Sequence, residues 1–451
     1  MNGNRLKCNS FISQHVPVLA RKELCTTRVL GSGGFCSVSV IQKVTLQCEQ
    51  ETNLGIEEKD ARRRLSKRFD NYYDKHYSAN NIVVPGYTPA ADPLEQKPPR
   101  IALKELKSSL QNERYRIGAK DLINEIAILS KCSHPNIITL YAVGCDDKGS
   151  DDYSLPSTMI ANRKLSFAII DQLRSTLRNR IYKWKEDQGV SFLKSRKAQN
   201  DLWLERLVVM IKVADAISYL HSKGIMHRDL NPDNIGFADD NAVKLFDFGL
   251  AKSLENEDNI ASEEEKQDSL LPRNEDELFD LTGTTGTLRY DETLKLHSSY
   301  LFQHICQLLN SFLFRYMAPE VALDMPYGFK ADVHSLGLIM HESLSLNKPY
   351  IHVQPQNFIK EVMIEGYRPS MHDSWPTIIK DLISNMWSSN IARRPSSKEV
   401  VETLGVLLRG DDTHLYPCTG SWKLKMVTRF DNIVNICTEC EVTDGIKHGH
   451  I

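Results

Sequence analysis

Two short apolar runs near the middle of the chain flank a polar turn, which is the pattern of a β-hairpin. The runs are Ile235–Phe237 and Val243–Phe246. Asp229 and Asn234 precede the first run, and Asp247 follows the second. Because a hairpin brings its two ends together, we expect these three side chains to converge at its open end.

Carboxylate and amide oxygens in such a place suit Mg²⁺, which prefers hard oxygen ligands and usually keeps phosphates and waters in its other positions. A further carboxylate nearby can accept a proton from an attacking hydroxyl group. Each of these residues, taken singly, is an ordinary turn Asp or capping Asn. The prediction of a site therefore depends on their combination.

Apolar spacing also predicts longer elements. We expect helices at Ile56–Phe69, Lys120–Lys131 and Leu202–Ser222 and a strand at Leu165–Ile170. The first helix lies in a polar stretch, residues 51–100, which we interpret as an insertion between two strands. The helix carries a cluster of basic residues, namely Arg62, Arg63, Arg64, Lys67 and Arg68. We interpret this cluster as a solvated helix face rather than a docking or localisation patch.

The 451 residues have room for two or three average domains, or for one two-lobed enzyme with insertions. A formal net charge of −2 gives no reason to expect a nucleic-acid partner or an anionic membrane surface. No apolar run is long enough to span a bilayer, and residues 1–20 lack the apolar core of a signal peptide. Ten scattered cysteines fit a reducing compartment, so we expect a cytoplasmic protein, with a nuclear location as the alternative. The pair Cys437 and Cys440 is compatible with zinc, but a reduced tail is favoured.

The hairpin and its surroundings resemble the catalytic core of the eukaryotic protein kinases. The chain reads His-Arg-Asp at 227–229, then Asn234, then Asp-Phe-Gly at 247–249. The resemblance covers about residues 29–408 and implies an α+β fold with a small β-rich N-lobe and a larger, mainly helical C-lobe. We therefore expect an N-terminal segment (1–24), an N-lobe (25–172, with the insertion at about 51–100), a C-lobe (173–408) and a C-terminal tail (409–451). The C-lobe would contain a long activation segment (247–320) with an atypical insert (291–316).

A glycine-rich turn lies between β-rich stretches at residues 29–38. Glycines allow a tight turn and let backbone N–H groups approach phosphate closely. The resemblance makes this turn the loop that covers the ATP phosphates. Its expected ATP-binding residues are Leu30, Gly31, Gly33, Gly34 and Val38. Cys36 stands where the family has its third glycine, and an accessible Cys36 thiolate would be open to alkylation or oxidation.

The resemblance assigns residues 100–104 to the strand that carries the nucleotide-binding lysine. Lys104 would neutralise phosphate oxygens of ATP, and Ala102 would line the same site. Glu125, on the following helix, would pair with Lys104 and fix its ammonium group. Asp171 would lie in the connector between the lobes, where the adenine ring hydrogen-bonds with the backbone.

The implied reaction is transfer of the γ-phosphoryl group of ATP to a hydroxyl group of a protein substrate. Asp229 would accept the proton of that hydroxyl, while Asn234 and Asp247 would hold Mg²⁺. The sequence Asn-Pro-Asp-Asn at 231–234 favours Ser/Thr substrates, and its surroundings most resemble the tyrosine-kinase-like group. Asn231 stands where the family has a lysine that contacts the γ-phosphate, so we expect slower transfer.

The end of the activation segment carries the candidates for regulation. An acidic stretch at 255–280 is followed by a Thr-rich one at 281–290. A phosphate on Thr282, Thr284 or Thr285 would bind Arg228 and order the segment. Thr287 matches the family's threonine that contacts the catalytic Asp in Ser/Thr kinases.

The chain departs from the family pattern after residue 290. The dipeptide Arg-Tyr occurs at 289–290 and again at 315–316, separated by an apolar insert, and Met-Ala-Pro-Glu follows at 317–320. We interpret the insert as a retained intron, because Asn-Ser-Phe-Leu-Phe-Arg can be encoded by a pyrimidine-rich tract ending in AG. The alternative is a real insertion that regulates or abolishes substrate binding.

Two scaffold contacts are also implied: Asp332 would hydrogen-bond the catalytic-loop backbone, and Arg394 would pair with Glu320. Two other functions stay open. A catalytically impaired kinase fold acting as a nucleotide-binding scaffold is favoured by Asn231 and by the insert. A metabolic small-molecule kinase is disfavoured by Thr287 and by the Ala-Pro-Glu motif. The expected partners are protein substrates, with neither nucleic acid nor a membrane span.

Overall fold

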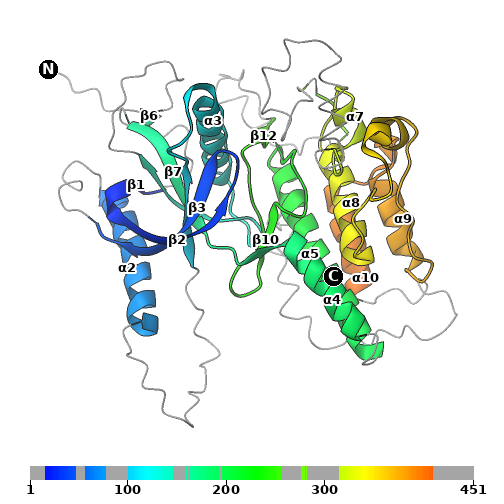
Figure 1. Cartoon of the computed structure of the whole chain (residues 1–451), viewed down its shortest axis with the longest axis horizontal. Coiled ribbons are helices and arrows are strands. Elements are labelled where there is room, and N and C mark those ends of the chain that lie inside the picture. The colour runs from blue at the N-terminus through cyan, green and yellow to red at the C-terminus, as the bar shows by residue number, and fades with distance from the viewer. Residues whose placement is uncertain are drawn as a thin grey trace, which may run out of the picture.

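The computed structural model describes residues 16–46, 56–77, 100–145, 159–160, 163–191, 196–254, 276–279, 281 and 314–409. The large sheet, together with α2 (Ile56–Tyr77) and α3 (Asn112–Leu129), lies at the left of Figure 1, and the other helices lie at the right. The bilobal α+β fold expected from the sequence is thereby confirmed.

The N-lobe is built on a seven-stranded sheet in the order β1-β5-β7-β4-β3-β2, with β6 paired to β7. Its elements are β1 (Val18–Ala20), η1 (Arg21–Glu23), β2 (Leu24–Ser32), β3 (Cys36–Val44), α2 (Ile56–Tyr77), β4 (Ile101–Leu106), α3 (Asn112–Leu129), β5 (Leu140–Cys145), β6 (Met159–Ile160) and β7 (Arg163–Asp171). The sheet thus begins at Val18, within the segment that we had assigned to the N-terminus, because β1 pairs in parallel with β5.

The C-lobe is mainly helical. Its elements are β8 (Ser175–Thr176), α4 (Leu177–Ser191), α5 (Arg196–Ser222), β9 (Ile225–Met226), β10 (Ile235–Phe237), β11 (Val243–Leu245), β12 (Lys252–Ser253), α7 (Pro319–Ala322), α8 (Lys330–Ser345), η4 (Pro355–Asn357), η5 (Ile359–Ile364), α9 (Thr377–Met386), η6 (Ile391–Arg393) and α10 (Ser397–Arg409). Helix α8 is buried from Lys330 to Leu344, and α5 packs against it and α10. Residues 227–234, which the resemblance makes the catalytic loop, follow α5 in the chain and contact α8 through Asp332.

The three expected helices are present. Helix α2 begins at Ile56, as predicted, and extends further, to Tyr77, whereas the other two begin earlier than predicted. Helix α3 starts at Asn112 rather than Lys120, and α5 starts at Arg196 rather than Leu202. The added residues are mostly polar, so they lack the apolar repeat on which the prediction depended. No helix in the described ranges is long and apolar enough to cross a membrane.

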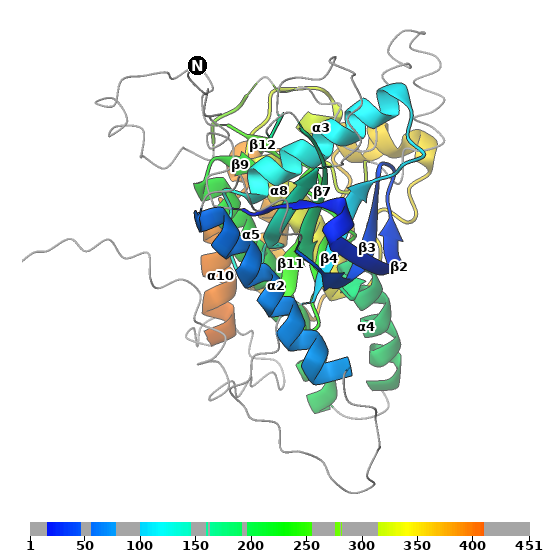
Figure 2. The same ribbon diagram turned by 90° about the vertical axis from the view of Figure 1, so that its left-hand side faces the viewer.

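The interpretation of the basic cluster on α2 as a solvated face is wrong for Arg62. Its Nη2 lies 2.5 Å from Glu23 Oε1, and the two side chains are 3% and 0% exposed. Its Nη1 also donates to the Val18 carbonyl at 2.6 Å. Arg63 and Arg64 are exposed, as expected. Helix α2 packs on β1 and β3, at the left of Figure 1 and in front in Figure 2, so one of its arginines reaches the lobe interior.

Candidate active site

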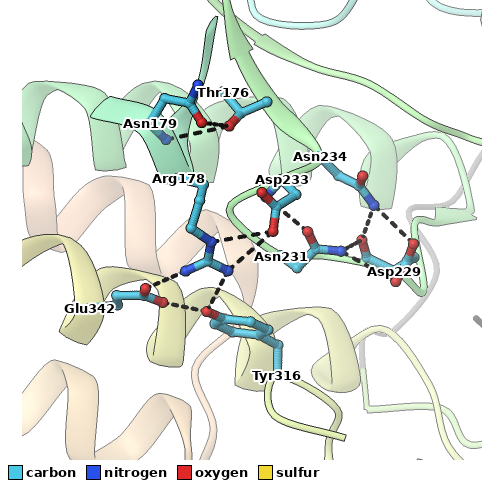
Figure 3. Close-up of polar contacts among 9 residues, drawn as sticks. All are labelled: Thr176, Arg178, Asn179, Asp229, Asn231, Asp233, Asn234, Tyr316 and Glu342. Carbon is cyan, nitrogen blue, oxygen red and sulfur yellow. Dashed lines mark hydrogen bonds and ion pairs between the residues drawn. The ribbon is translucent and has the colours of Figure 1, made fainter. Parts of the chain in front are cut away.

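The hairpin brings its flanking polar residues together. Strands β10 and β11 are antiparallel, with Ile235 opposite Leu245. Asn234 Nδ2 donates to Asp229 Oδ2 at 2.9 Å and to the Asp229 carbonyl at 2.8 Å (Figure 3). Asp247 lies close enough for its negative charge to raise the pKa of Asp229.

Asp332, on α8, holds the backbone at the start of the catalytic loop, residues 227–234. Its carboxylate accepts the N–H groups of His227 and Arg228 at 2.8 and 2.9 Å, as expected from the sequence. It also lies 3.0 Å from His221 Nε2. Arg228 has a φ of 68°, a left-handed conformation that is strained for a side chain of this size. The two hydrogen bonds to Asp332 hold the loop in that conformation just before Asp229.

Lys104 lies between two carboxylates. Its Nζ is 2.5 Å from Glu125 Oε2 and 3.2 Å from Asp247 Oδ1. Burial alone would lower the pKa of Lys104, but Asp247 and Glu125 outweigh it and raise the pKa above its ordinary value. Lys104 therefore remains charged, and its charge also lowers the pKa of Asp247. A fixed cation next to an ionised carboxylate is an arrangement that can hold a phosphate and its metal.

Asp229 has the properties of a proton acceptor. Burial raises its pKa from an ordinary 3.8 to about 7, and the charge of Asp247 adds to this effect. The hydrogen bonds from Asn234 and Asn231 act in the opposite direction, because they stabilise the carboxylate. A general base is most effective when its pKa lies near the working pH.

The glycine-rich turn connects β2 to β3. Gly31, Gly33 and Gly34 are exposed, and Gly33 N–H donates to the Cys36 carbonyl at 2.9 Å. Leu30 and Val38 are half-buried at the two sides of the turn, and Val38 lies opposite Lys104 in the sheet. Ala102 is fully buried in β4, two residues before Lys104. The turn and the lysine are therefore adjacent, as the nucleotide-site prediction requires.

Cys36 is a poor candidate for thiolate chemistry. Burial raises its pKa from 9.0 to about 12; Lys104 opposes this rise, whereas Glu125 and Asp247 add to it. The thiol is therefore protonated near neutral pH, which disfavours alkylation.

The side chain of Asp171 binds other groups of the protein. Its carboxylate accepts the Thr139 N–H at 2.8 Å and the Tyr141 hydroxyl at 2.7 Å, and it lies 3.4 Å from Lys244 Nζ. The carboxylate is thus taken up by protein partners, and the role expected for the Asp171 backbone in nucleotide binding stays a prediction.

Asn124 is a residue that the sequence reading missed. Its Nδ2 reaches the carbonyls of Phe248, Gly249 and Ala251 at 3.2, 3.0 and 2.8 Å. These contacts tie the Asp-Phe-Gly turn to α3, next to Glu125. Adjacency to Glu125 was the only available signal, since nothing in the sequence shows where an Asn side chain points.

Arg228 contacts a tyrosine. Its Nη2 lies 2.5 Å from the Tyr327 hydroxyl, and its guanidinium lies over the Tyr327 ring. The backbone of Tyr327 pairs with that of Phe279, and Lys330 lies 3.2 Å from Asp276, so this part of the acidic stretch is docked. The candidate phosphate acceptors Thr282, Thr284 and Thr285, together with Thr287, lie outside the described residues.

The second copy of the Arg-Tyr dipeptide is packed into the C-lobe. Arg315 and Tyr316 are buried, and Arg315 Nη1 donates to the Pro349 carbonyl. Just after it, Glu320 accepts Arg394 at 2.5 and 2.8 Å, so the predicted scaffold pair is confirmed. The first copy, at 289–290, and the insert up to residue 313 lie outside the described residues.

Comparison with known proteins agrees with this geometry. Residues 95–268 match the protein kinase domain, and residues 301–404 match the description protein tyrosine and serine/threonine kinase. The chain belongs to the protein kinase family. The first match ends at residue 268, before the insert, and the second begins at residue 301, within it, so the kinase pattern is present on both sides of the unmatched residues 269–300.

Several relatives of this kinase are named serine/threonine-protein kinases, and one, HT1 of Arabidopsis thaliana, is named a serine/threonine/tyrosine-protein kinase. It is 27% identical to PknD of Protochlamydia amoebophila over 62% of this chain and 23% of PknD. It is 25% identical to the Arabidopsis thaliana kinase VIK over 67% of this chain and 54% of VIK, and 27% identical to STY17 of the same plant over 46% and 28%. The kinase thus spans from about a quarter to about half the length of these relatives.

The donor set fits the divalent metal that the family implies. Asn234 uses its amide nitrogen towards Asp229, which leaves the amide oxygen for a metal. Asp247 is ionised and half-exposed. Mg²⁺ typically takes one or two protein ligands and completes its shell with phosphate and water, so two donors suffice. In the part of the chain that the structure describes, no group of three or more His, Cys, Asp or Glu side chains is arranged to hold a metal ion.

Proposed function

We propose that this kinase transfers the γ-phosphoryl group of ATP to Ser or Thr hydroxyls of protein substrates, with Mg²⁺ as its metal. The observation that carries the proposal is the position of Lys104, 2.5 Å from Glu125 and 3.2 Å from Asp247. This ion pair is the arrangement that the phosphoryl-transfer mechanism of the family requires. Names of Ser/Thr kinases among the relatives support the choice of acceptor.

The residues divide the work between binding and proton transfer. Lys104 would bind phosphate oxygens, and Glu125 would keep its ammonium group in place. Asp229, held by Asn234, would orient the substrate hydroxyl and accept its proton. Mg²⁺ held by Asn234 and Asp247 would supply positive charge to the phosphates. Most of the rate enhancement would come from positioning and charge neutralisation.

The location that best fits this kinase is a reducing compartment, the cytoplasm or the nucleus. Cys25, Cys36 and Cys132 are free thiols in the described part of the chain. Fluorescence microscopy of a tagged protein tests this, and a luminal or secreted signal would contradict it.

The test is a phosphotransfer assay with ATP, Mg²⁺ and matched Ser, Thr and Tyr peptides, run on the full chain and on a chain lacking residues 291–316. Asp229→Asn and Lys104→Met should each abolish transfer to the Ser and Thr peptides, and chelation of Mg²⁺ should do the same. Nucleotide binding without transfer in both chains would instead favour a scaffold. Transfer to the Tyr peptide alone would contradict the proposed acceptor.

A further inference from the structure

Arg178 joins three parts of the C-lobe (Figure 3). Its Nη1 donates to Glu342 on α8, and its Nη2 lies 2.9 Å from the Tyr316 hydroxyl. Its Nε and Nη2 lie 3.3 and 3.2 Å from Asp233 Oδ2, in the catalytic loop. The Tyr316 hydroxyl donates in turn to Glu342. We call Arg178, Asp233, Tyr316 and Glu342 the Arg178 cluster.

The position of Arg178 is set by the start of helix α4. The Thr176 hydroxyl accepts the Asn179 N–H at 3.4 Å and donates to Asn179 Oδ1 at 3.1 Å, which caps the helix. Arg178 N–H, which has no partner within the helix, donates to the Pro232 carbonyl at 3.1 Å. Both the backbone and the side chain of Arg178 therefore dock on the catalytic loop.

A cation in the first turn of a helix brings no benefit to the helix itself. It faces the positive end of the helix dipole, which destabilises the helix. The Arg178 side chain is 13% exposed and is compensated by Asp233 and Glu342. Arg178 at this position therefore stabilises the contact of α4 with α8 and with the catalytic loop, rather than helix α4 itself.

The cluster continues to the catalytic carboxylate through Asn231. Asp233 N–H donates to Asn231 Oδ1 at 2.9 Å. This contact turns the amide nitrogen of Asn231 towards Asp229, where it lies 3.4 Å from Oδ1 and 3.2 Å from the carbonyl. A neutral amide at the position of the family's lysine therefore helps to hold the Asp229 carboxylate.

We propose that Arg178 is a positioning residue. It fixes Asp233, and through Asp233 it fixes Asn231, so that docking of Tyr316 on Glu342 helps to orient the Asp229 carboxylate, which Asn234 also holds. Docking of Tyr316 in the C-lobe would then promote proton transfer at Asp229. This role rests on the proposed kinase activity.

The choice of variant follows from burial. Glu342 is 3% exposed, so replacing Arg178 would leave a buried carboxylate without a partner and risk misfolding. Asp233 is 58% exposed, and its loss leaves Arg178 paired with Glu342 and Tyr316. Asp233→Ala therefore breaks the side-chain contact of Arg178 with the catalytic loop and leaves in place the rest of the cluster and the contact of the Arg178 N–H with Pro232.

The kinetic test is a double-mutant cycle with Asp233→Ala, Asn231→Ala and the combination. Small misplacements at a reacting centre can cost up to about 10²-fold in rate. We expect each single variant to lower kcat by about tenfold, with KM for ATP and for the peptide within about twofold of wild type. Because Asp233 and Asn231 would act on Asp229 through the same chain of contacts, the kcat of the double variant should lie within about twofold of the kcat of the slower single variant. The proposal would be overturned if the loss of kcat in the double variant equalled the product of the two single losses, or if only the KM for the peptide changed.

The matched control is Arg180→Gln. Arg180 lies on the same helix and pairs with Glu205 at 3.1 Å and Asn241 at 2.9 Å, away from Asp229. Its kcat should stay within about twofold of wild type. A tenfold loss in this variant would mean that α4 acts through general stability.

Hydrogen exchange gives a readout that needs no activity. Tyr316→Phe removes the hydroxyl that contacts both Arg178 and Glu342, and it leaves the sequence of residues 229–234 unchanged. Exchange of the backbone amides in residues 229–234 should become several-fold faster in this variant. Unchanged exchange there would overturn the coupling, even in an active enzyme. A wild type that transfers no phosphoryl group would refute the proposed function, whatever the exchange result.

Discussion

The ion pair between Arg62 and Glu23 allows a quantitative test of how the insertion helix α2 is attached. Glu23 is 0% exposed on its side chain, so Arg62→Met would leave a buried carboxylate without its cation. Breaking a buried pair from one side costs roughly 3–5 kcal/mol. A solvated arginine on the same helix would cost less than about 0.5 kcal/mol.

Thermal unfolding measures the difference. For cooperative units of this size, 1 kcal/mol corresponds to roughly 2–4 °C, so Arg62→Met should lower Tm by roughly 6–20 °C. Arg63→Met is the matched control, because Arg63 is 57% exposed on its side chain, and its Tm should change by no more than about 2 °C.

The double variant Arg62→Met with Glu23→Gln distinguishes two causes of lost stability, namely the buried charge of Glu23 and the lost packing of the Arg62 side chain. It should recover most of the lost stability, because no uncompensated charge is left behind. If Arg62→Met and Arg63→Met shift Tm equally, α2 is a solvated appendage and the reasoning fails.

Three further predictions follow from the active site and its surroundings. Asn231→Lys should have a kcat several-fold above that of Asn231→Ala in the phosphotransfer assay, because it adds a charge that stabilises the transition state; equal kcat values in the two variants would mean that the missing cation is already compensated. Gly118→Ala would place a Cβ 2.7 Å from Phe35 Cβ at the glycine-rich turn, so it should cost roughly 1–3 kcal/mol and weaken ATP binding in a nucleotide titration, whereas unchanged affinity would contradict the contact. Burial holds the pKa of His334 well below 6.5, so the unfolded chain binds more protons and stability is lost as the pH falls below about 6.5. His334→Phe should therefore lose less Tm than wild type between pH 7 and 5.5, and equal losses would count against this role.

The sequence predicted the parts of the site that are local. Asp229, Asn234 and Asp247 flank one short hairpin, so the apolar pattern and the turn were enough to bring them together. Lys104 and Glu125 came from the resemblance, and their pairing distance of 2.5 Å agrees with it. The assignment of Mg²⁺, ATP and catalytic roles to these residues remains a prediction.

The contacts that the sequence could not predict join residues far apart in the chain. The burial of Arg62 depends on Glu23, and no periodicity distinguishes Arg62 from its exposed neighbour Arg63. The contacts of Asn124 and Arg178 depend on where α3 and α4 come to lie against the catalytic loop. Such contacts are set by packing, because a polar side chain on a helix carries no signal for its distant partner.

The packed position of Arg315 and Tyr316 decides what a shorter chain would lose. Removing residues 291–316 or residues 289–314 yields the same polypeptide, in which a single Arg-Tyr dipeptide precedes Met317. Three residues, 317–319, separate that remaining dipeptide from Glu320, which is held by its ion pair with Arg394. It would therefore make the contacts of Arg315 and Tyr316 with Pro349, Glu342 and Arg178, so removal of these 26 residues would preserve this attachment.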